Sequence, residues 1–429
     1  MKKILIISYF FPPCNLTASH RVYSWARYFH RYGLYPIIIT RNWEHPVGSP
    51  GDILKPGGDR VIHEKKEEYE AYYLPHKGSL RDRIYERFHD TAFGALSKPF
   101  TLLELIGQNY FSALTPFRYM EKFARGLLKE SPDIEDMLIS GNPFILFKSG
   151  YRLKKEFPRI RWIADYRDDW TTSEINRHEG FLRSMVHKAE AVSEKKWLSN
   201  ARFITSVSPW YTQKIAAYTG REGYTIYNGF DRLIPGETSA QQTFNIVYNG
   251  TLYGTQKVED FCASVKKVIA RNSDIRFRLQ FPGLAFDPVQ ARRVREAMQG
   301  YEELPEITGR IPQNEVLDIQ KNAHVLLMFS HPGVKGITSS KLFEYLSLRR
   351  PVLVYPGDND ILDEIIRETS CGTVCADQSA MEQEMEKLVT EYRNTGTTAV
   401  HANDAAILKY SREKQAEILA GLILRHLSR

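Results

Sequence analysis

A hydroxyl-rich loop that leads into a helix is the stretch of this sequence best suited to chemistry. The loop, 336–340, has three residues that suit a helix N-cap: Thr338, Ser339 and Ser340. Segment 341–348 has helical spacing, and 352–355 has the composition of a buried strand. Such a helix start offers backbone N–H groups and a positive dipole end to a phosphate. Glu344 lies one turn further on, where it could bind a ribose, although an ordinary βα unit shows the same pattern.

Charged residues also gather after a predicted strand in the first half of the chain. Segment 165–170 reads DYRDDW and contains three carboxylates and one arginine. Such residues pack poorly in a core and are typical of binding sites. His20 and Arg21 stand where the first predicted helix begins, at the strand edge that binds ligands in open α/β sheets. The same position also suits ordinary surface side chains.

Composition indicates a globular protein with an anionic partner. The chain has 429 residues, of which 42% are hydrophobic and 25% are charged, so about two domains of roughly 200 residues are expected. The net charge of +7 favours a phosphorylated metabolite, a nucleic acid or an acidic membrane. Because the sequence holds no recognition helix or RNA-binding motif, we expect no nucleic acid partner.

The cysteines and the N-terminus indicate a cytoplasmic protein. The four cysteines are scattered without metal-ligand spacing, so we expect free thiols and no metal site. The N-terminal sequence MKKILIISYFFPP has a short apolar run that ends at two prolines, which is typical of a first buried strand rather than a signal peptide. No apolar stretch approaches membrane-spanning length. We expect a soluble protein, or a peripheral one at the inner face of the plasma membrane.

Strand, loop and helix alternate along both halves of the chain. This order predicts an α/β fold with two Rossmann-like domains, at 1–231 and 244–408, joined by a polar linker at 232–243. Residues 409–429 form an amphipathic helix that we expect to pack back toward the N-terminal domain. A basic, aromatic and helical insertion covers about 79–130. It suits either a contact with an anionic membrane or packing within the first domain.

The order of these pieces resembles the GT-B fold, and specifically the retaining glycosyltransferase family 4 (group 1) of the bacterial surface-polysaccharide type. The resemblance covers most of the chain and implies two Rossmann-like domains whose parallel sheets face a central cleft. It rests on five motifs in the family's order: Tyr9–Pro13 with Arg21, Trp162–Trp170, Tyr227–Asp231, Asn249–Thr251 with Lys257, and Ser340–Leu346 with Arg350–Val352.

The resemblance implies a nucleotide diphosphate sugar as donor, with no metal and no cofactor. Glu344 would bind the ribose, and Lys257 would neutralise the diphosphate leaving group. The other implied donor-binding residues are Gly250, Thr251, Gly283, Arg310, Ile311, Gly336, Thr338, Ser339, Ser340 and Lys341. The implied acceptor-binding residues are His20, Arg21, Arg167 and Asp169. Asp168 is the carboxylate that we expect to face the cleft and to act in catalysis.

Three features depart from the family pattern, and one of them is the first loop, which reads CNLTAS at 14–19 instead of a glycine-rich sequence. Gly336 stands where the family has its first motif carboxylate, and Thr251 stands where it has an arginine. Lys257 is then the main cation, unless Lys341 or Lys335 substitutes. The resemblance predicts transfer of a sugar to a lipid-linked or saccharide acceptor in cell-surface polysaccharide synthesis. The departures also fit a non-catalytic nucleotide-binding or scaffold subunit. An epimerase or phosphorylase is a third alternative, although we find no motif for a phosphorylase cofactor lysine.

Overall fold

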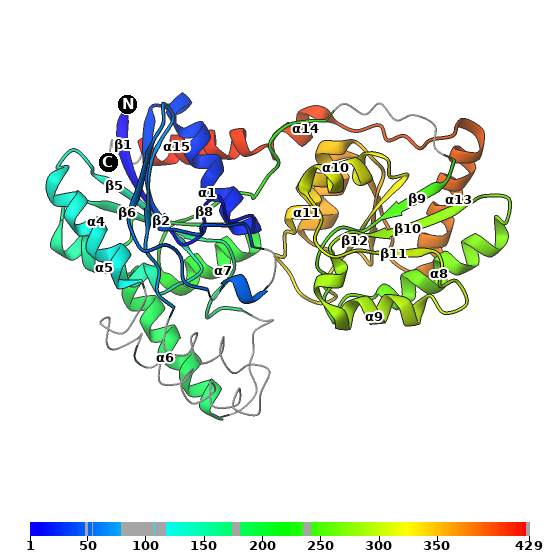
Figure 1. Ribbon diagram of the computed structural model, residues 1–429, viewed down its shortest axis with the longest axis horizontal. Helices are drawn as coiled ribbons and strands as arrows, with labels where there is room; N and C mark the ends of the chain where they lie inside the picture. Colours follow the sequence, from blue (N-terminus) through cyan, green and yellow to red (C-terminus); the bar gives the residue numbers. More distant parts are fainter. Residues whose placement is uncertain are drawn as a thin grey trace. The chain divides into compact units, whose positions relative to one another are not determined.

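The protein is divided into two compact units in this computed structural model, which describes residues 1–47, 50–53, 55–78, 107, 117–173, 181–234 and 242–425 (Figure 1). Unit 1 comprises Met1–Asn228 together with Arg412–Arg429. Unit 2 comprises Gly229–Ser411. Each unit has its own sheet with helices around it, which confirms the α/β fold with two sheet domains that the sequence predicts.

The sheet of unit 1 has eight strands among the described residues, in the order β3-β4-β2-β1-β5-β6-β7-β8. All neighbouring strands are parallel except β3 and β4. The strands are β1 (Lys2–Ser8), β2 (Leu34–Arg41), β3 (Ile62–Lys65), β4 (Glu70–Leu74), β5 (Asp136–Gly141), β6 (Arg161–Tyr166), β7 (Ile204–Ser206) and β8 (Gly223–Thr225). The α-helices in the described part of this unit are α1 (Thr17–Tyr28), α4 (Arg118–Glu130), α5 (Leu146–Glu156), α6 (Phe181–Leu198), α7 (Pro209–Thr219) and α15 (Arg412–Arg425).

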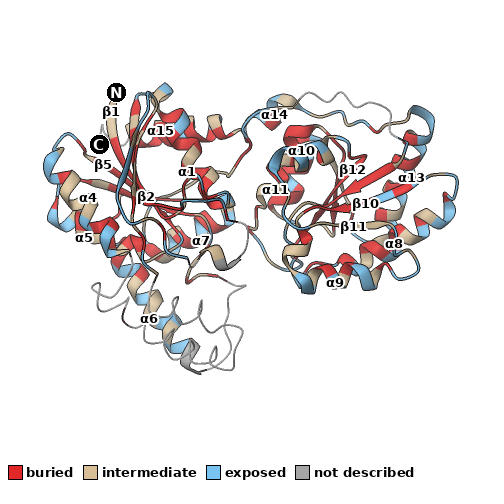
Figure 2. Cartoon of the chain, in the orientation of Figure 1, coloured by how far each residue is buried: buried red, intermediate tan, exposed pale blue. Residues whose placement is uncertain are grey.

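The core of unit 1 includes the last helix of the chain. In β1, every residue from Ile4 to Ser8 is buried, as expected for a central strand covered on both faces (Figure 2). Helix α15 buries Ala416, Leu419 and Ile423 in the same core as Trp25 of α1. The helix predicted to start at residue 409 therefore starts at Arg412, and residues 409–411 belong to unit 2.

The sheet of unit 2 is entirely parallel, with the order β11-β10-β9-β12-β13-β14. Its strands are β9 (Phe244–Val247), β10 (Phe277–Phe281), β11 (Pro305–Ile307), β12 (Val325–Phe329), β13 (Val352–Tyr355) and β14 (Gly372–Val374). Its helices are α8 (Val258–Arg271), α9 (Pro288–Ala297), α10 (Gln313–Lys321), α11 (Ser340–Leu348), α12 (Ile361–Thr369), α13 (Gln378–Thr395) and α14 (Asp404–Leu408). The predicted helix at 341–348 and the predicted strand at 352–355 are both confirmed, as α11 and β13.

The predicted basic insertion lies mostly outside the described residues, as does part of the predicted linker. The described end of the insertion is α4, which packs against α5 in unit 1. Helix α4 buries Met120, Ala124 and Leu128 on one face. Over the described residues, none of the helices combines the length and the apolar character that crossing a membrane requires.

Candidate functional site

The loops after β9 and β10 touch each other at two glycines in unit 2. The Gly250 N–H donates to the Pro282 carbonyl at 2.9 Å. Gly250 and Gly283 both have positive φ, at 82° and 85°, where side chains are strained. A Cβ on Gly283 would lie 3.7 Å from the Gly250 Cα. The glycines therefore let two loops meet at the carboxyl edge of a parallel sheet, where such sheets bind ligands.

Lys341 reaches this loop contact from the first turn of α11. Its Nζ donates to the Tyr248 hydroxyl at 2.8 Å and to the Thr251 carbonyl at 3.0 Å. It also lies 4.0 Å from the centroid of the Tyr248 ring. Protein atoms surround the amine densely although the side chain keeps some solvent contact, and this burial lowers the pKa of Lys341 to about 7 against the opposing effect of Glu344. Sequence reasoning missed Tyr248, because a tyrosine at a strand end reads as core.

The start of α11 is open at its backbone. Ser339 occupies the N-cap position with extended backbone angles, but no side chain caps the helix there. The predicted hydroxyl cap is therefore correct in position and wrong in its hydrogen bond. Thr338 is buried, Ser340 is the first helical residue, and Glu344 is partly exposed one turn further on. The Leu342 N–H donates to the Ser339 carbonyl at 3.1 Å, and an uncapped helix start keeps its earlier N–H groups and its positive dipole end available to an anion.

A carboxylate lies directly beside Gly336. The Gly336 N–H donates to Asp360 Oδ2 at 2.5 Å, and Asp360 is the N-cap residue of α12. The Asp358 carboxylate accepts hydrogen bonds from three backbone N–H groups of this turn. Burial raises the pKa of Asp358 to about 6. Our sequence interpretation ended at Gly357 and missed this turn, whose signal is the acidic run DND just before a helix.

The remaining donor-site predictions have looser surroundings. Lys257 is exposed in the N-cap position of α8, with no hydrogen-bond or ion-pair partner among the described residues. The Arg310 guanidinium stacks 4.3 Å over the Phe286 ring, and Ile311 beside it is partly buried. The loop before Arg310 is tied to Gly283, whose N–H donates to the Thr308 hydroxyl at 3.3 Å. The structure thus gathers Gly250, Thr251, Gly283 and Lys341 by direct contacts, and it shows no such contact for Lys257.

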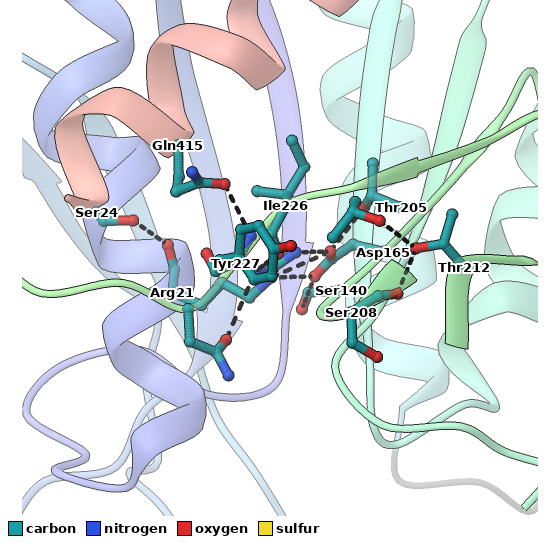
Figure 3. Close-up of polar contacts among 12 residues, drawn as sticks. Arg21, Ser24, Ser140, Asp165, Thr205, Ser208, Thr212, Ile226, Tyr227 and Gln415 are labelled. Atoms are coloured by element: carbon teal, nitrogen blue, oxygen red, sulfur yellow. Dashed lines mark hydrogen bonds and ion pairs between the residues drawn. The ribbon is translucent and has the colours of Figure 1, made fainter. Parts of the chain in front are cut away.

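Arg21 in unit 1 is a buried structural cation rather than an acceptor-binding side chain (Figure 3). Its side chain is 2% exposed and that of Asp165 is fully buried. Arg21 Nη2 donates to Asp165 Oδ1 at 2.7 Å, while its Nη1 donates to the Ile226 carbonyl at 2.6 Å. Asp165 also accepts from the hydroxyls of Ser140 and Thr205 at 2.9 and 2.7 Å. The prediction that Arg21 contacts the acceptor is wrong, because internal groups take up its guanidinium.

The other charged residues after β6 divide into exposed and paired ones. The Asp168 side chain is 59% exposed and lies 3.5 Å from Arg167. Asp169 is buried and pairs with Lys214 at 3.0 Å. The Arg167 guanidinium lies 5.4 Å from the centroid of the Phe10 ring, and burial lowers its pKa. Arg167 Nη1 has no hydrogen-bond partner among the described residues. His20 is partly exposed on α1.

A hollow of about 860 Å³ opens at the β3–β4 edge of unit 1. Its lining includes Asn42, Glu44, Arg60, His63 and Tyr73. A buried aromatic cluster, in which the Tyr9 hydroxyl lies 3.3 Å from His76 Nε2, is built from the same loops. Burial and the nearby Arg41 lower the pKa of His76 to about 3. Our sequence analysis missed both the hollow and the aromatic cluster, because the residues that form them come from four separate segments of the chain.

Known structures share this fold along the whole chain. Sucrose-phosphate synthase from Thermosynechococcus elongatus is 13% identical with a TM-score of 0.62, covering 100% of this chain and 99% of that chain. The α,α-trehalose 6-phosphate synthase from Burkholderia multivorans is 10% identical with a TM-score of 0.59, covering 100% and 97%. Anabaena HepE in complex with UDP and glucose is 10% identical with a TM-score of 0.59, covering 99% and 100%.

These matches define the class of fold. The two parallel-sheet units match GT-B glycosyltransferase structures, which confirms the predicted GT-B fold. No protein-family model and no curated protein sequence matches the chain. Among the described residues, no group of three or more His, Cys, Asp or Glu side chains could hold a metal ion. The four cysteines are free and buried.

Proposed function

We propose that this protein is a retaining glycosyltransferase that moves a sugar from a nucleotide diphosphate donor to an acceptor, without a metal or a cofactor. One observation carries the proposal. In unit 2, the glycine loops at Gly250 and Gly283, the amine of Lys341 and the uncapped start of α11 meet at the carboxyl edge of a parallel sheet. Backbone N–H groups, a helix dipole and a cation at one such edge suit a diphosphate.

The donor would lie along α11 from its first turn to Glu344. Glu344 would accept hydrogen bonds from the ribose, and the backbone at Thr338, Ser339 and Ser340 would hold phosphate oxygens. Lys257 is exposed and has no partner among the described residues, so its charge is available to stabilise the diphosphate as it leaves. Asp360 is well placed to supply the carboxylate that Gly336 lacks, since its oxygen lies on the Gly336 amide.

The acceptor would be a lipid-linked or growing saccharide bound by unit 1, in cell-surface polysaccharide synthesis at the inner face of the plasma membrane. Asp168 is the exposed carboxylate after β6 and is the proposed catalytic group of this unit. Arg167 keeps one buried guanidinium nitrogen without a partner among the described residues, which suits a polar acceptor group. Asp169 would act through Lys214, with which it pairs.

A donor screen tests the proposal. Thermal unfolding is followed with UDP, GDP and dTDP and with their sugars, and hits are carried into hydrolysis and transfer assays. We expect one base to raise the melting temperature and the matching nucleotide sugar to turn over. Glu344→Gln should weaken nucleotide binding, whereas Glu391→Gln should not, since the partly exposed Glu391 of α13 accepts from the Ala399 N–H, outside the proposed site. Failure of every nucleotide to bind would contradict the proposal.

A non-catalytic GT-B subunit is the second candidate, and Gly336 is the observation that favours it. The residue at that position has no side chain, and its N–H is occupied by Asp360. This candidate predicts nucleotide binding without turnover of any sugar nucleotide. Turnover by the wild type separates the two functions, and in an enzyme Asp360→Asn should lower that turnover.

A further inference from the structure

The hydrogen bonds of Lys341 set it apart from Arg21, the cation that a buried carboxylate neutralises in unit 1. Both of its oxygen partners, the Tyr248 hydroxyl and the Thr251 carbonyl, are uncharged. No carboxylate lies within ion-pair distance of its Nζ in the described part of the chain. A buried ammonium without a counter-ion is costly, because its desolvation is not repaid.

The titratable groups around Lys341 do not supply that counter-ion. Glu344 and Tyr345 stand on its own helix, and Glu344 is the one group that favours the charged amine. Tyr248 faces it from the end of β9, and His331 of the loop after β12 lies near enough for the charge of Lys341 to affect it. Burial raises the pKa of Tyr248, so this phenol stays neutral at physiological pH. His331 has a lowered pKa, in part because of Lys341, and is neutral as well.

We propose that Lys341 is the cation that receives the diphosphate of the donor, and that its amine takes up one proton from solvent when the diphosphate binds. This inference rests on the proposed function, because it concerns the same nucleotide site. It would also explain how the loop could bind an anion although residue 251 is a threonine. Lys341 Nζ donates to the Thr251 carbonyl at 3.0 Å. Its protonated amine would supply, at this position, the positive charge that the threonine side chain lacks.

The number of N–H groups on the Lys341 amine explains why the amine should take up one proton when the diphosphate binds. A neutral amine has two N–H groups, and the two hydrogen bonds of Lys341 use both. Protonation adds a third N–H, which no described residue accepts. A diphosphate oxygen beside Gly250 would accept that N–H and supply the missing negative charge. A Cβ on Gly250 would lie 4.0 Å from Lys341 Cε, so the space beside the amine is open on that side.

Proton uptake makes affinity depend on pH with a definite sign. The amine of the free protein loses its proton above about pH 7, whereas the bound diphosphate keeps the amine charged to higher pH. Affinity for a nucleoside diphosphate should therefore fall as pH rises from 7.5 to 9, by up to about tenfold per pH unit. The terminal phosphate of the nucleotide does not interfere, because it is fully ionised over this range, with a pKa near 6.

Calorimetry at pH 8 tests the inference, with UDP, GDP and dTDP as probes and with HEPES and Tris as buffers of different ionisation enthalpy. The wild type should take up close to one proton per nucleotide bound. Lys341→Arg should bind without proton uptake, because arginine is always charged. Lys341→Met should bind at least about tenfold more weakly, corresponding to one lost charged hydrogen bond. Lys267→Met, on the outer face of α8, should match the wild type.

The outcomes separate the two proposals. Binding by the wild type without proton uptake, or with an uptake that Lys341→Arg retains, overturns the inference and leaves the proposed function standing. Absence of binding by all three nucleotides overturns both. Circular dichroism of each variant shows whether it is folded, and Lys341→Arg provides the decisive comparison even if Lys341→Met unfolds.

Discussion

Two buried cations, one in each unit, show how differently this chain uses positive charge. Arg21 in unit 1 donates to both oxygens of Asp165 and to backbone carbonyls, and every nitrogen of its guanidinium has an internal partner. Lys341 in unit 2 donates to two uncharged oxygens. Arg21 lies on α1, the helix after β1, and Lys341 lies on α11, the helix after β12. Their positions in the fold are therefore alike and do not explain why their partners differ.

The difference lies in the counter-ion. A buried arginine paired with a buried carboxylate is electrically complete and can only hold structure in place. Arg21 joins α1 to β6 and to the segment after β8, and the N–H of Tyr227 in that segment donates to Gln415 of α15 (Figure 3). A buried lysine without a carboxylate is electrically incomplete, and a ligand anion completes it. We therefore expect substitutions at Arg21 to affect folding and substitutions at Lys341 to affect binding.

The largest effect is expected from breaking the buried pair of Arg21 and Asp165. Arg21→Met leaves Asp165 buried and unpaired, which should lower the free energy of unfolding by about 3–5 kcal/mol. Lys341→Met removes a poorly compensated charge and should change that free energy by less than about 1 kcal/mol. All six tryptophans lie in unit 1, so urea unfolding followed by tryptophan fluorescence reports Arg21→Met directly. Far-UV circular dichroism covers both units. Equal losses from the two substitutions would remove the distinction.

A second buried group in unit 1 predicts a pH dependence. The pKa of His76 is about 3 in the folded protein and 6.5 ordinarily, so the unfolded chain binds more protons between these values. Stability should fall as pH drops from 6.5 toward 3, by about 1.4 kcal/mol per pH unit for this one proton. His76→Gln should remove that share of the slope in urea unfolding at pH 4 to 6. An unchanged slope would show that His76 is not neutral in the folded state.

A smaller contrast concerns the neighbouring carboxylates after β6. Asp169→Asn weakens a largely buried pair with Lys214 and should cost about 1–3 kcal/mol in urea unfolding. Asp168→Asn changes an exposed side chain and should stay within about 0.5 kcal/mol of the wild type. If Asp168 acts in transfer, the same Asp168→Asn protein should lose turnover while remaining stable. A stable and fully active Asp168→Asn protein would exclude the catalytic role.

The fold was predictable where apolar runs end at clear breakers. Segment 352–355 stands between Pro351 and Pro356 and is a strand over those same residues. Segment 224–229, YTIYNG, has the composition of one strand, but β8 ends at Thr225 and the next carbonyls accept hydrogen bonds from Arg21. Strand β3 was missed because its four residues, IHEK, are exposed or partly exposed and show no apolar pattern.

The types of residue at the site could be predicted from the sequence, but the contacts between those residues and distant parts of the chain could not. The resemblance indicated Gly250, Gly283 and Lys341, which the structure brings into one contact region. It also indicated Arg21 as an acceptor ligand, because sequence does not show that a carboxylate 144 residues away neutralises it. Asp360 was missed for the same reason, since its contact with Gly336 depends on how two loops fold together.

Hydrogen exchange with and without nucleotide tests the central distinction most directly. UDP or GDP, whichever binds, should slow amide exchange at 249–251, 282–283 and 336–342 in unit 2. Amides around Arg21, at 18–24 and 226–228, should exchange at the same rate with and without nucleotide. Protection around Arg21 without protection at 336–342 would contradict the assignment of the nucleotide site to unit 2.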